Sequence, residues 1–289
     1  MLSLDQYQLG EYLTRAESVI LESNSTAIRK EIHPNGRYYV GADLGTAYLV
    51  LVVLDEKLQP VCGEYQFAQV VRDGLVVDFI GAIERLKRMK ERLEKYLGCE
   101  LFSAASAFPP GVPYAEVRST ANVVEAAGLD CIDLIDEPSA ANNLLNIRNG
   151  AIVDVGGGTT GIAIIENGQV VYSADEATGG THFSLVIAGA NNISFEEAEN
   201  LKKDPKTQGL LFPVVRPVME KVGNIVSRHL NGKNVKGIIL VGGAACFPGI
   251  AEVVEDYAGI PTKVPQRPLF VTPIGIAMQH AKKIKELEQ

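Results

Sequence analysis

Two short segments of this 289-residue chain combine aspartate, glycine and threonine in the same order. The first runs from Asp43 to Ala47 and the second from Asp154 to Thr160, and each follows a run of apolar residues typical of a strand. Glycine in such a turn lets backbone N–H groups approach phosphate oxygens closely, and the aspartate can hold Mg²⁺ through water. A single copy also occurs in ordinary hairpins, but two copies in corresponding settings predict a site for ATP or ADP with Mg²⁺.

The two segments contain the candidate nucleotide-binding residues. They are Asp43, Gly45, Thr46, Ala47, Gly156, Gly157, Gly158, Thr159 and Thr160, with Asp43 and Asp154 as the candidates for the magnesium site. Two halves that present such loops to one another would form a cleft in which a polyphosphate meets amides from both sides and two carboxylates. This geometry is typical of nucleotide hydrolysis.

The elements that must position these loops occur twice along the chain. In the first half, the sequence predicts strands near 38–42, 48–54 and 61–68, a helix over 79–97, a strand within 101–108, a helix over 114–127 and a strand over 132–135. In the second half, strands at 151–155, 161–165 and 170–173 precede helical segments and a strand at 237–241. The repeated order predicts an α/β protein made of two similar lobes.

The N-terminal segment differs from both halves. Its apolar residues recur at helical spacing over residues 2–22, which predicts an amphipathic helix, and a polar stretch then separates it from the first lobe. Two interpretations are open, because the apolar stripe can pack on its own domain or dock on another protein. We expect the helix and linker in 1–30, the first lobe in 31–147 with a final helix over 270–289, and the second lobe in 148–269.

Composition narrows the class of partner. The formal net charge of -8 gives no broad positive field, which argues against nucleic acid and against an anionic membrane surface. No apolar run approaches the length of a membrane span, so we expect a cytoplasmic protein. The four cysteines are scattered without a metal-ligand spacing, and we interpret them as buried or half-buried apolar residues.

Further segments between the two loops and after them resemble those of one superfamily. Residues 135–141, with the sequence Ile-Asp-Glu-Pro-Ser-Ala-Ala, residues 240–249, with Leu-Val-Gly-Gly-Ala-Ala and then Pro-Gly, and residues 272–277, with Thr-Pro-Ile-Gly-Ile-Ala, follow the loops in order. Together the five segments resemble the actin, DnaK-type chaperone and MreB/FtsA/PilM superfamily over residues 37–285. The resemblance implies an actin-like (ribonuclease H-like) ATPase fold with a nucleotide cleft.

The same resemblance implies roles for individual residues. Glu137 is the group that would polarise the attacking water, and with Asp154 it forms the candidate catalytic pair; alternatively, Glu137 simply favours the start of a helix. Glu199 and Lys202 resemble contacts to ribose and adenine, although such a pair can equally be an exposed surface ion pair. Gly242, Gly243 and Ala244 resemble the adenosine-binding turn. The turn at Gly179 and Gly180 also resembles a family segment, but Thr181 and His182 replace its usual acid, which leaves its role open.

Within the superfamily, the sequence from Asp43 to Tyr48, Leu54-Asp55 and the small size resemble a chaperone-like family associated with bacterial ethanolamine utilisation. This resemblance implies ATP and protein partners, among them ethanolamine-utilisation enzymes, and an association with a bacterial microcompartment. Our leading hypothesis is a slow ATPase that acts as a chaperone or assembly factor. A nucleotide-responsive scaffold without turnover and a small-molecule kinase are the alternatives, and for a kinase we find no acceptor segment.

Overall fold

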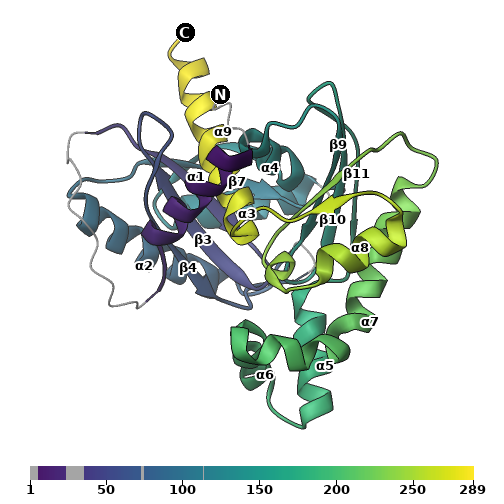
Figure 1. Ribbon diagram of the computed structural model, residues 1–289. Coiled ribbons are helices and arrows are strands. Elements are labelled where there is room, and N and C mark those ends of the chain that lie inside the picture. Colours follow the sequence, from purple (N-terminus) through teal and green to yellow (C-terminus); the bar gives the residue numbers. More distant parts are fainter. Residues whose placement is uncertain (1–5, 24–35, 73–74, 113) are drawn as a thin grey trace. The chain divides into compact units, whose positions relative to one another are not determined.

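The computed structural model describes residues 6–23, 36–72, 75–112 and 114–289 (Figure 1). The chain divides into two compact units, Met1–Asn146 with Phe270–Gln289 and Ile147–Leu269. Most of the predicted linker after the N-terminal helix lies outside the described residues, as does His33. Of the two compact units, the first is unit 1 and the second is unit 2.

Unit 1 contains a six-stranded sheet with the order β1-β4-β3-β2-β7-β8. The predicted three-stranded meander is confirmed, because β2 (Tyr39–Leu44), β3 (Tyr48–Leu54) and β4 (Pro60–Phe67) pair antiparallel in sequence. The sheet continues with β7 (Ser103–Phe108) and β8 (Asp130–Asp136), which run parallel to β2. A small separate hairpin is formed by β5 (Val71–Arg72) and β6 (Leu75–Val76).

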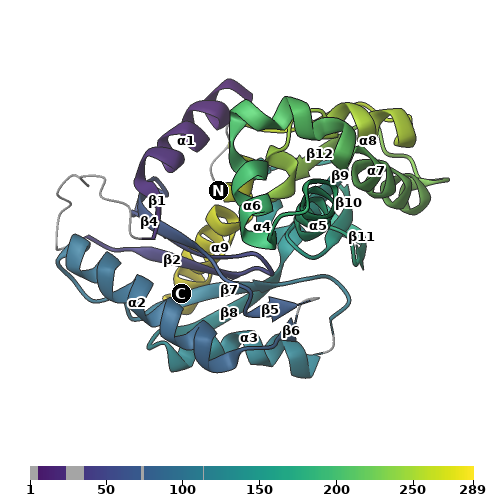
Figure 2. The ribbon, with the colours of Figure 1, turned by 90° about the horizontal axis from the view of Figure 1, so that it is seen from below.

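Helices cover both faces of this sheet. On one face lie α2 (Phe79–Leu97) and α3 (Tyr114–Ala126) (Figure 2). The helix α2 buries Leu86, Met89 and Leu93 against alternate residues of β2 and β3. On the other face, α9 (Val271–Leu287) packs against β2 so closely that a Cβ atom on Gly41 would lie 2.5 Å from the carbonyl oxygen of Pro273. The helix α4 (Glu137–Leu145) crosses α9 where a Cβ on Gly275 would overlap the carbonyl oxygen of Ala140.

The N-terminal segment packs on unit 1. The described part of helix α1 spans Gln6–Val19, and it ends before the predicted residue 22 because Ile20–Glu22 form β1; predicted residues 2–5 lie outside the described residues. These residues are extended because β1 pairs in parallel with the edge of β4, where Ile20 lies opposite Gly63. Leu13, Ala16 and Ile20 are fully or almost fully buried. The apolar stripe therefore packs on its own unit, which is the first of the two interpretations.

Unit 2 contains a five-stranded sheet with the order β11-β10-β9-β12-β13. Its strands are β9 (Gly150–Val155), β10 (Thr160–Glu166), β11 (Gln169–Glu176), β12 (Ile238–Val241) and β13 (Thr262–Lys263). Its helices are α5 (Gly180–Asn191), α6 (Phe195–Lys203), α7 (Pro205–Leu230) and α8 (Ile250–Ala258), and short 3₁₀ turns lie at Ala244–Cys246 and Pro268–Phe270. The apolar core lies between the sheet and α5, α7 and α8.

The two sheets share one topology apart from the added strand β1. In each sheet, an antiparallel meander is followed by a strand that pairs in parallel with the first strand of the meander. A further strand then pairs in parallel with that added strand. The predicted duplication is confirmed at the level of strand order and direction. Both predicted phosphate loops occupy the same place in it, between the first and second strands of the meander.

Candidate functional site

The two predicted phosphate loops have the same turn geometry. In unit 1 the backbone N–H of Gly45 donates to the carbonyl oxygen of Tyr48, and in unit 2 that of Gly156 donates to Thr159, both at 3.0 Å. Inside each turn, the backbone N–H groups of Thr46 and Ala47, and of Gly157 and Gly158, donate to no backbone carbonyl in the described parts of the chain. Unpaired amides in a tight turn are the groups that bind phosphate oxygens.

The unit 2 loop is fixed by the start of α5. The carbonyl oxygens of Gly156 and Gly157 accept hydrogen bonds from the backbone N–H groups of Gly180 (2.9 Å) and Thr181 (2.7 Å). A Cβ atom on Gly179 would lie 2.6 Å from the Gly156 oxygen, so only glycine allows this approach. Because the loop carbonyls are held by α5, the loop amides remain available. The turn that the sequence left open is thus a structural support of the phosphate loop.

The adenosine-type turn meets the aspartate of the same unit. Asp154 is the penultimate residue of β9, is 7% exposed and pairs with Val241 in the sheet register. Gly242 follows with φ +90, and a Cβ there would lie 2.2 Å from Oδ1 of Asp154 and 2.6 Å from the carbonyl oxygen of Val155. A Cβ on Gly180 would lie 3.4 Å from Cβ of Ala244. The Gly242 turn therefore packs on the buried carboxylate of Asp154, and the α5 turn packs on both the phosphate loop and Ala244.

Glu199 and Lys202 form a buried ion pair, so the interpretation as an exposed surface pair is wrong. Glu199 is 4% exposed, and its Oε1 accepts hydrogen bonds from the Lys202 ammonium and from the Ser184 hydroxyl. Lys202 also donates to the carbonyl oxygen of Gly180 at 3.0 Å, which joins the pair to the α5 turn. Burial lowers the pKa of the Lys202 ammonium, against the opposing effect of the Glu199 carboxylate. Sequence reasoning missed Ser184 because a serine inside an apolar helix gives no signal of its own.

Glu137 lies at the first turn of α4, directly after β8, and is partly buried. Asp136 caps this helix through a hydrogen bond from the backbone N–H of Ser139 to its Oδ1 at 3.0 Å, and Pro138 occupies the first turn. The helix-start interpretation is therefore correct for this segment. It does not compete with a catalytic role, because Asp136 supplies the cap and Glu137 is a separate carboxylate.

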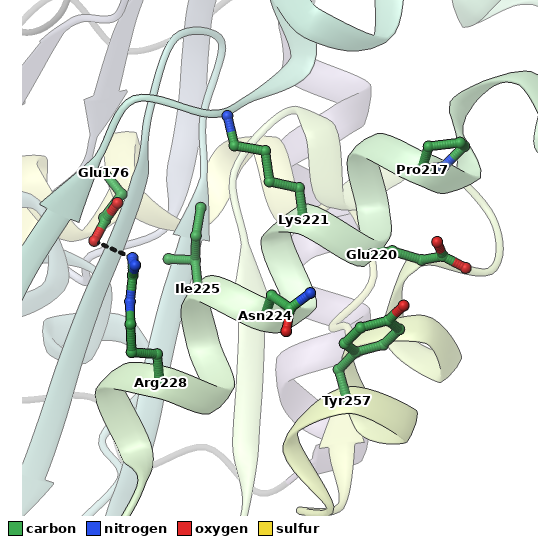
Figure 3. Close-up of a pocket in the computed structure, with 8 residues that line it drawn as sticks. All are labelled: Glu176, Pro217, Glu220, Lys221, Asn224, Ile225, Arg228 and Tyr257. Carbon is green, nitrogen blue, oxygen red and sulfur yellow. Dashed lines mark hydrogen bonds and ion pairs between the residues drawn. The ribbon is translucent and has the colours of Figure 1, made fainter.

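A surface pocket of unit 2 lies apart from the predicted residues. Its lining comes from α7, α8 and the end of β11 and comprises Glu176, Pro217, Glu220, Lys221, Asn224, Ile225, Arg228 and Tyr257 (Figure 3). The Arg228 guanidinium binds Glu176 across it, at 2.5 Å (Figure 3). None of the predicted site residues lines this pocket.

Two further expectations concern metals and membranes. Within the described residues, no group of three or more histidine, cysteine or acidic side chains is arranged to hold a metal directly. The described helices include none that is both long and apolar enough to cross a bilayer. Among the cysteines, Cys62 is buried and Cys99 and Cys131 are half-buried, but Cys246 is exposed because it ends the short 3₁₀ turn after Gly243; for Cys246 the expectation of burial is wrong.

The duplicated sheet topology and the paired loops define the class of protein. The crystal structure of MreB5 of Spiroplasma citri bound to AMPPNP superposes with a TM-score of 0.72, covering 87% of this chain and 98% of that one at 20% identity. The family model for the type IV pilus assembly protein PilM matches residues 122–281. The fold is that of the actin-like ATPases.

Closer relatives define the family. The ethanolamine utilization protein EutJ of Escherichia coli (strain K12) is 43% identical over 250 residues, which cover 86% of this chain and 88% of that protein. The crystal structure of EutJ from Carboxydothermus hydrogenoformans has a TM-score of 0.88 and 44% identity, covering 95% of this chain and 99% of that one. The chain belongs to the family of the ethanolamine utilization protein EutJ.

Proposed function

We propose that this protein binds Mg·ATP through its two phosphate loops, hydrolyses it slowly and uses the nucleotide state to control a protein partner. The observation that carries the proposal is that, in unit 2, the Gly242 turn packs on buried Asp154 while the α5 turn holds the carbonyl oxygens of the phosphate loop. The loops fit a polyphosphate because loop amides have no backbone acceptor in the described residues, and glycine at positions 179 and 242 allows the close packing that fixes the loop and Asp154 of unit 2. The fold shared with AMPPNP-bound MreB5 supports the same ligand.

Each predicted residue then has a defined task. The amides of residues 45–47 and 156–160 hold phosphate oxygens, the turn from Gly242 to Ala244 holds the adenosine, and Glu199 contacts the ribose. Asp43 and Asp154 hold the Mg²⁺ ion through water. When bound, Mg²⁺ would supply positive charge that neutralises the phosphate oxygens. Glu137 orients the attacking water and accepts its proton, as a positioned carboxylate can.

The cellular role follows from the family. We infer that the partner is a protein of ethanolamine utilisation, and that this chain acts on its folding or assembly in the context of a microcompartment. The names of the relatives support the pathway, and the superfamily resemblance to DnaK-type chaperones supports action on another protein. ATP binding would change the population of the state that the partner recognises.

Turnover is tested with Glu137→Gln, which removes the base but keeps the shape of the side chain. We expect ATP affinity within about twofold of wild type and a turnover rate lower by about a hundredfold or more, which is the usual contribution of a general base. Glu84→Gln, at an exposed glutamate of α2 whose side chain is 62% exposed, is the matched control and should leave the rate unchanged. A wild-type protein that binds ATP without turnover would instead favour the nucleotide-responsive scaffold.

A further inference from the structure

Three side chains of unit 1 form a hydrogen-bonded chain that links β8 to α4 through α9. The side-chain amide of Gln279, on α9, donates from Nε2 to Oδ2 of Asp133, on β8, at 2.8 Å. Its Oε1 accepts a hydrogen bond from Nδ2 of Asn143, on α4, at 3.1 Å. The same Nδ2 donates to the backbone carbonyl oxygen of Gly275 at 3.2 Å. All three side chains are partly buried, where such bonds are stronger than in water.

The carboxylate at one end of this chain fixes the direction of every bond. Oδ1 of Asp133 accepts from the backbone N–H of Leu134 at 3.0 Å, and a carboxylate has no proton to give. Gln279 must therefore turn its NH₂ group towards Asp133 and its oxygen towards Asn143. Position 143 must in turn supply a donor, because an acceptor there would meet the oxygen of Gln279.

The crossing of α4 and α9 is made of small groups. A Cβ atom on Gly275 would overlap the carbonyl oxygen of Ala140, so the two backbones are in direct contact. Backbones this close leave no room for side chains that interlock at the crossing. The bonds from Asn143, on the next turn of α4, therefore supply the directional restraint on how far α4 is shifted and rotated along α9.

Asn143 and Glu137 lie near opposite ends of the same short helix, α4. The Asp136 cap ties the start of this helix to β8, and Asn143 ties its last turn to α9. A shift or rotation of α4 would move Glu137 with it, because the helix is one hydrogen-bonded unit. A displacement of about 1 Å at a reacting group can cost about a hundredfold in rate.

We propose that Asn143 is a positioning residue, which acts through Gln279 and Asp133 to hold α4 in place on α9 and β8. It thereby keeps the Glu137 carboxylate where it orients the attacking water. The inference rests on the proposed function and concerns its hydrolytic step, because none of the three side chains belongs to the turns proposed to hold the nucleotide. Loss of the chain should slow turnover without weakening ATP binding.

Three variants test the direction of the chain. Asn143→Asp places a second acceptor against Gln279, and Asp133→Asn, which still accepts from Leu134, places a second donor there. Each should lower the turnover rate at saturating Mg·ATP by about tenfold or more and leave the ATP affinity within about twofold of wild type. In the double variant Gln279 can turn its amide over and pair with both ends, so the rate should recover to within about threefold of wild type.

The control and the outcomes separate this inference from the proposed function. Asn234→Asp, at an exposed asparagine before β12, adds the same charge as Asn143→Asp and should leave the rate unchanged. Single variants that keep the wild-type rate, or a double variant no faster than the single variants, would overturn the role of the chain and leave nucleotide hydrolysis standing. Parallel losses of ATP affinity and rate, with a lower midpoint of thermal unfolding, would show general damage to unit 1 and would overturn the positioning role. A wild type without turnover would overturn this inference together with the proposed hydrolysis.

Discussion

Gly242 shows how closely one turn packs on the Asp154 carboxylate. It combines φ +90 with a backbone so close to Asp154 that no Cβ atom fits. Gly259 also has a positive φ of 66, at the end of α8, but a Cβ there meets nothing within 4 Å. Both positions share the positive φ, but only Gly242 has the steric conflict with the carboxylate. A comparison of the two therefore distinguishes the effect of backbone strain from that of the conflict.

Replacement of these glycines by alanine gives a matched pair. Gly259→Ala should lower the free energy of unfolding by about 1 kcal/mol, the cost of a left-handed alanine, and leave ATP affinity unchanged. Gly242→Ala should cost more and weaken ATP binding by about tenfold or more, because Asp154 must move away. Urea unfolding and calorimetry measure the two effects. Equal ATP affinity in both variants would show that Gly242 does not shape a nucleotide site.

The element formed by α1 and β1 is held on unit 1 by a few specific contacts. Ile20 fills the space above Gly63, where an added Cβ would lie 3.0 Å from its Cγ1 atom. The Tyr12 hydroxyl donates to the carbonyl oxygen of Leu58 at 2.5 Å, and the Ser23 hydroxyl reaches Oε2 of buried Glu64 at 3.3 Å. This segment belongs to the core of unit 1.

Truncation of Ile20 should therefore destabilise the protein. Ile20→Ala creates a cavity beside Gly63, and we expect the free energy of unfolding to fall by about 2–4 kcal/mol. Tyr7→Ala, on the same helix but at a residue that is 74% exposed, should change it by less than about 0.5 kcal/mol. Both values come from urea titration. A small effect for both would indicate that the segment is bound too loosely to be part of the unit.

The contact between α9 and the sheet contains a buried histidine. His280 is 2% exposed; its Nδ1 accepts from the backbone N–H of Val40 at 2.8 Å, and its Nε2 lies 3.0 Å from the Ser103 hydroxyl. With Nδ1 as acceptor, the proton resides on Nε2 and bonds to Ser103. Burial lowers the pKa of His280 from 6.5 to about 4, so the folded protein keeps it neutral.

This shift predicts a loss of stability in mild acid. Because the pKa is lower in the folded state, the unfolded chain takes up the proton first, and stability falls as the pH drops from 6.5 towards 4. The total loss is about 3 kcal/mol. Denaturant unfolding across this window should show a steeper pH dependence for wild type than for His280→Gln. Identical slopes would mean that His280 does not titrate as a buried neutral group.

For the molecule as a whole, the sequence predicted local and repeated features well. The succession of strands along the chain, the helix over Phe79–Leu97 and the two loop turns follow from apolar period and glycine placement, which are local signals. It could not predict that Ile20–Glu22 leave the helix, because their conformation depends on the distant edge of β4. It also gave no sign of Ser184, or that Glu199 and Lys202 are buried, since burial depends on residues that only the fold brings together.

The most direct test of the central claim is calorimetric titration of Mg·ATP into wild type and into Asp154→Asn and Asp154→Ala. Asp256→Ala, at an exposed aspartate of α8, is the matched control. Wild type and the control should bind ATP with equal affinity, and both Asp154 variants, shown to be folded by circular dichroism, should show no measurable binding because the magnesium site is lost. Undiminished affinity in folded Asp154 variants, or no binding by wild type, would contradict the account.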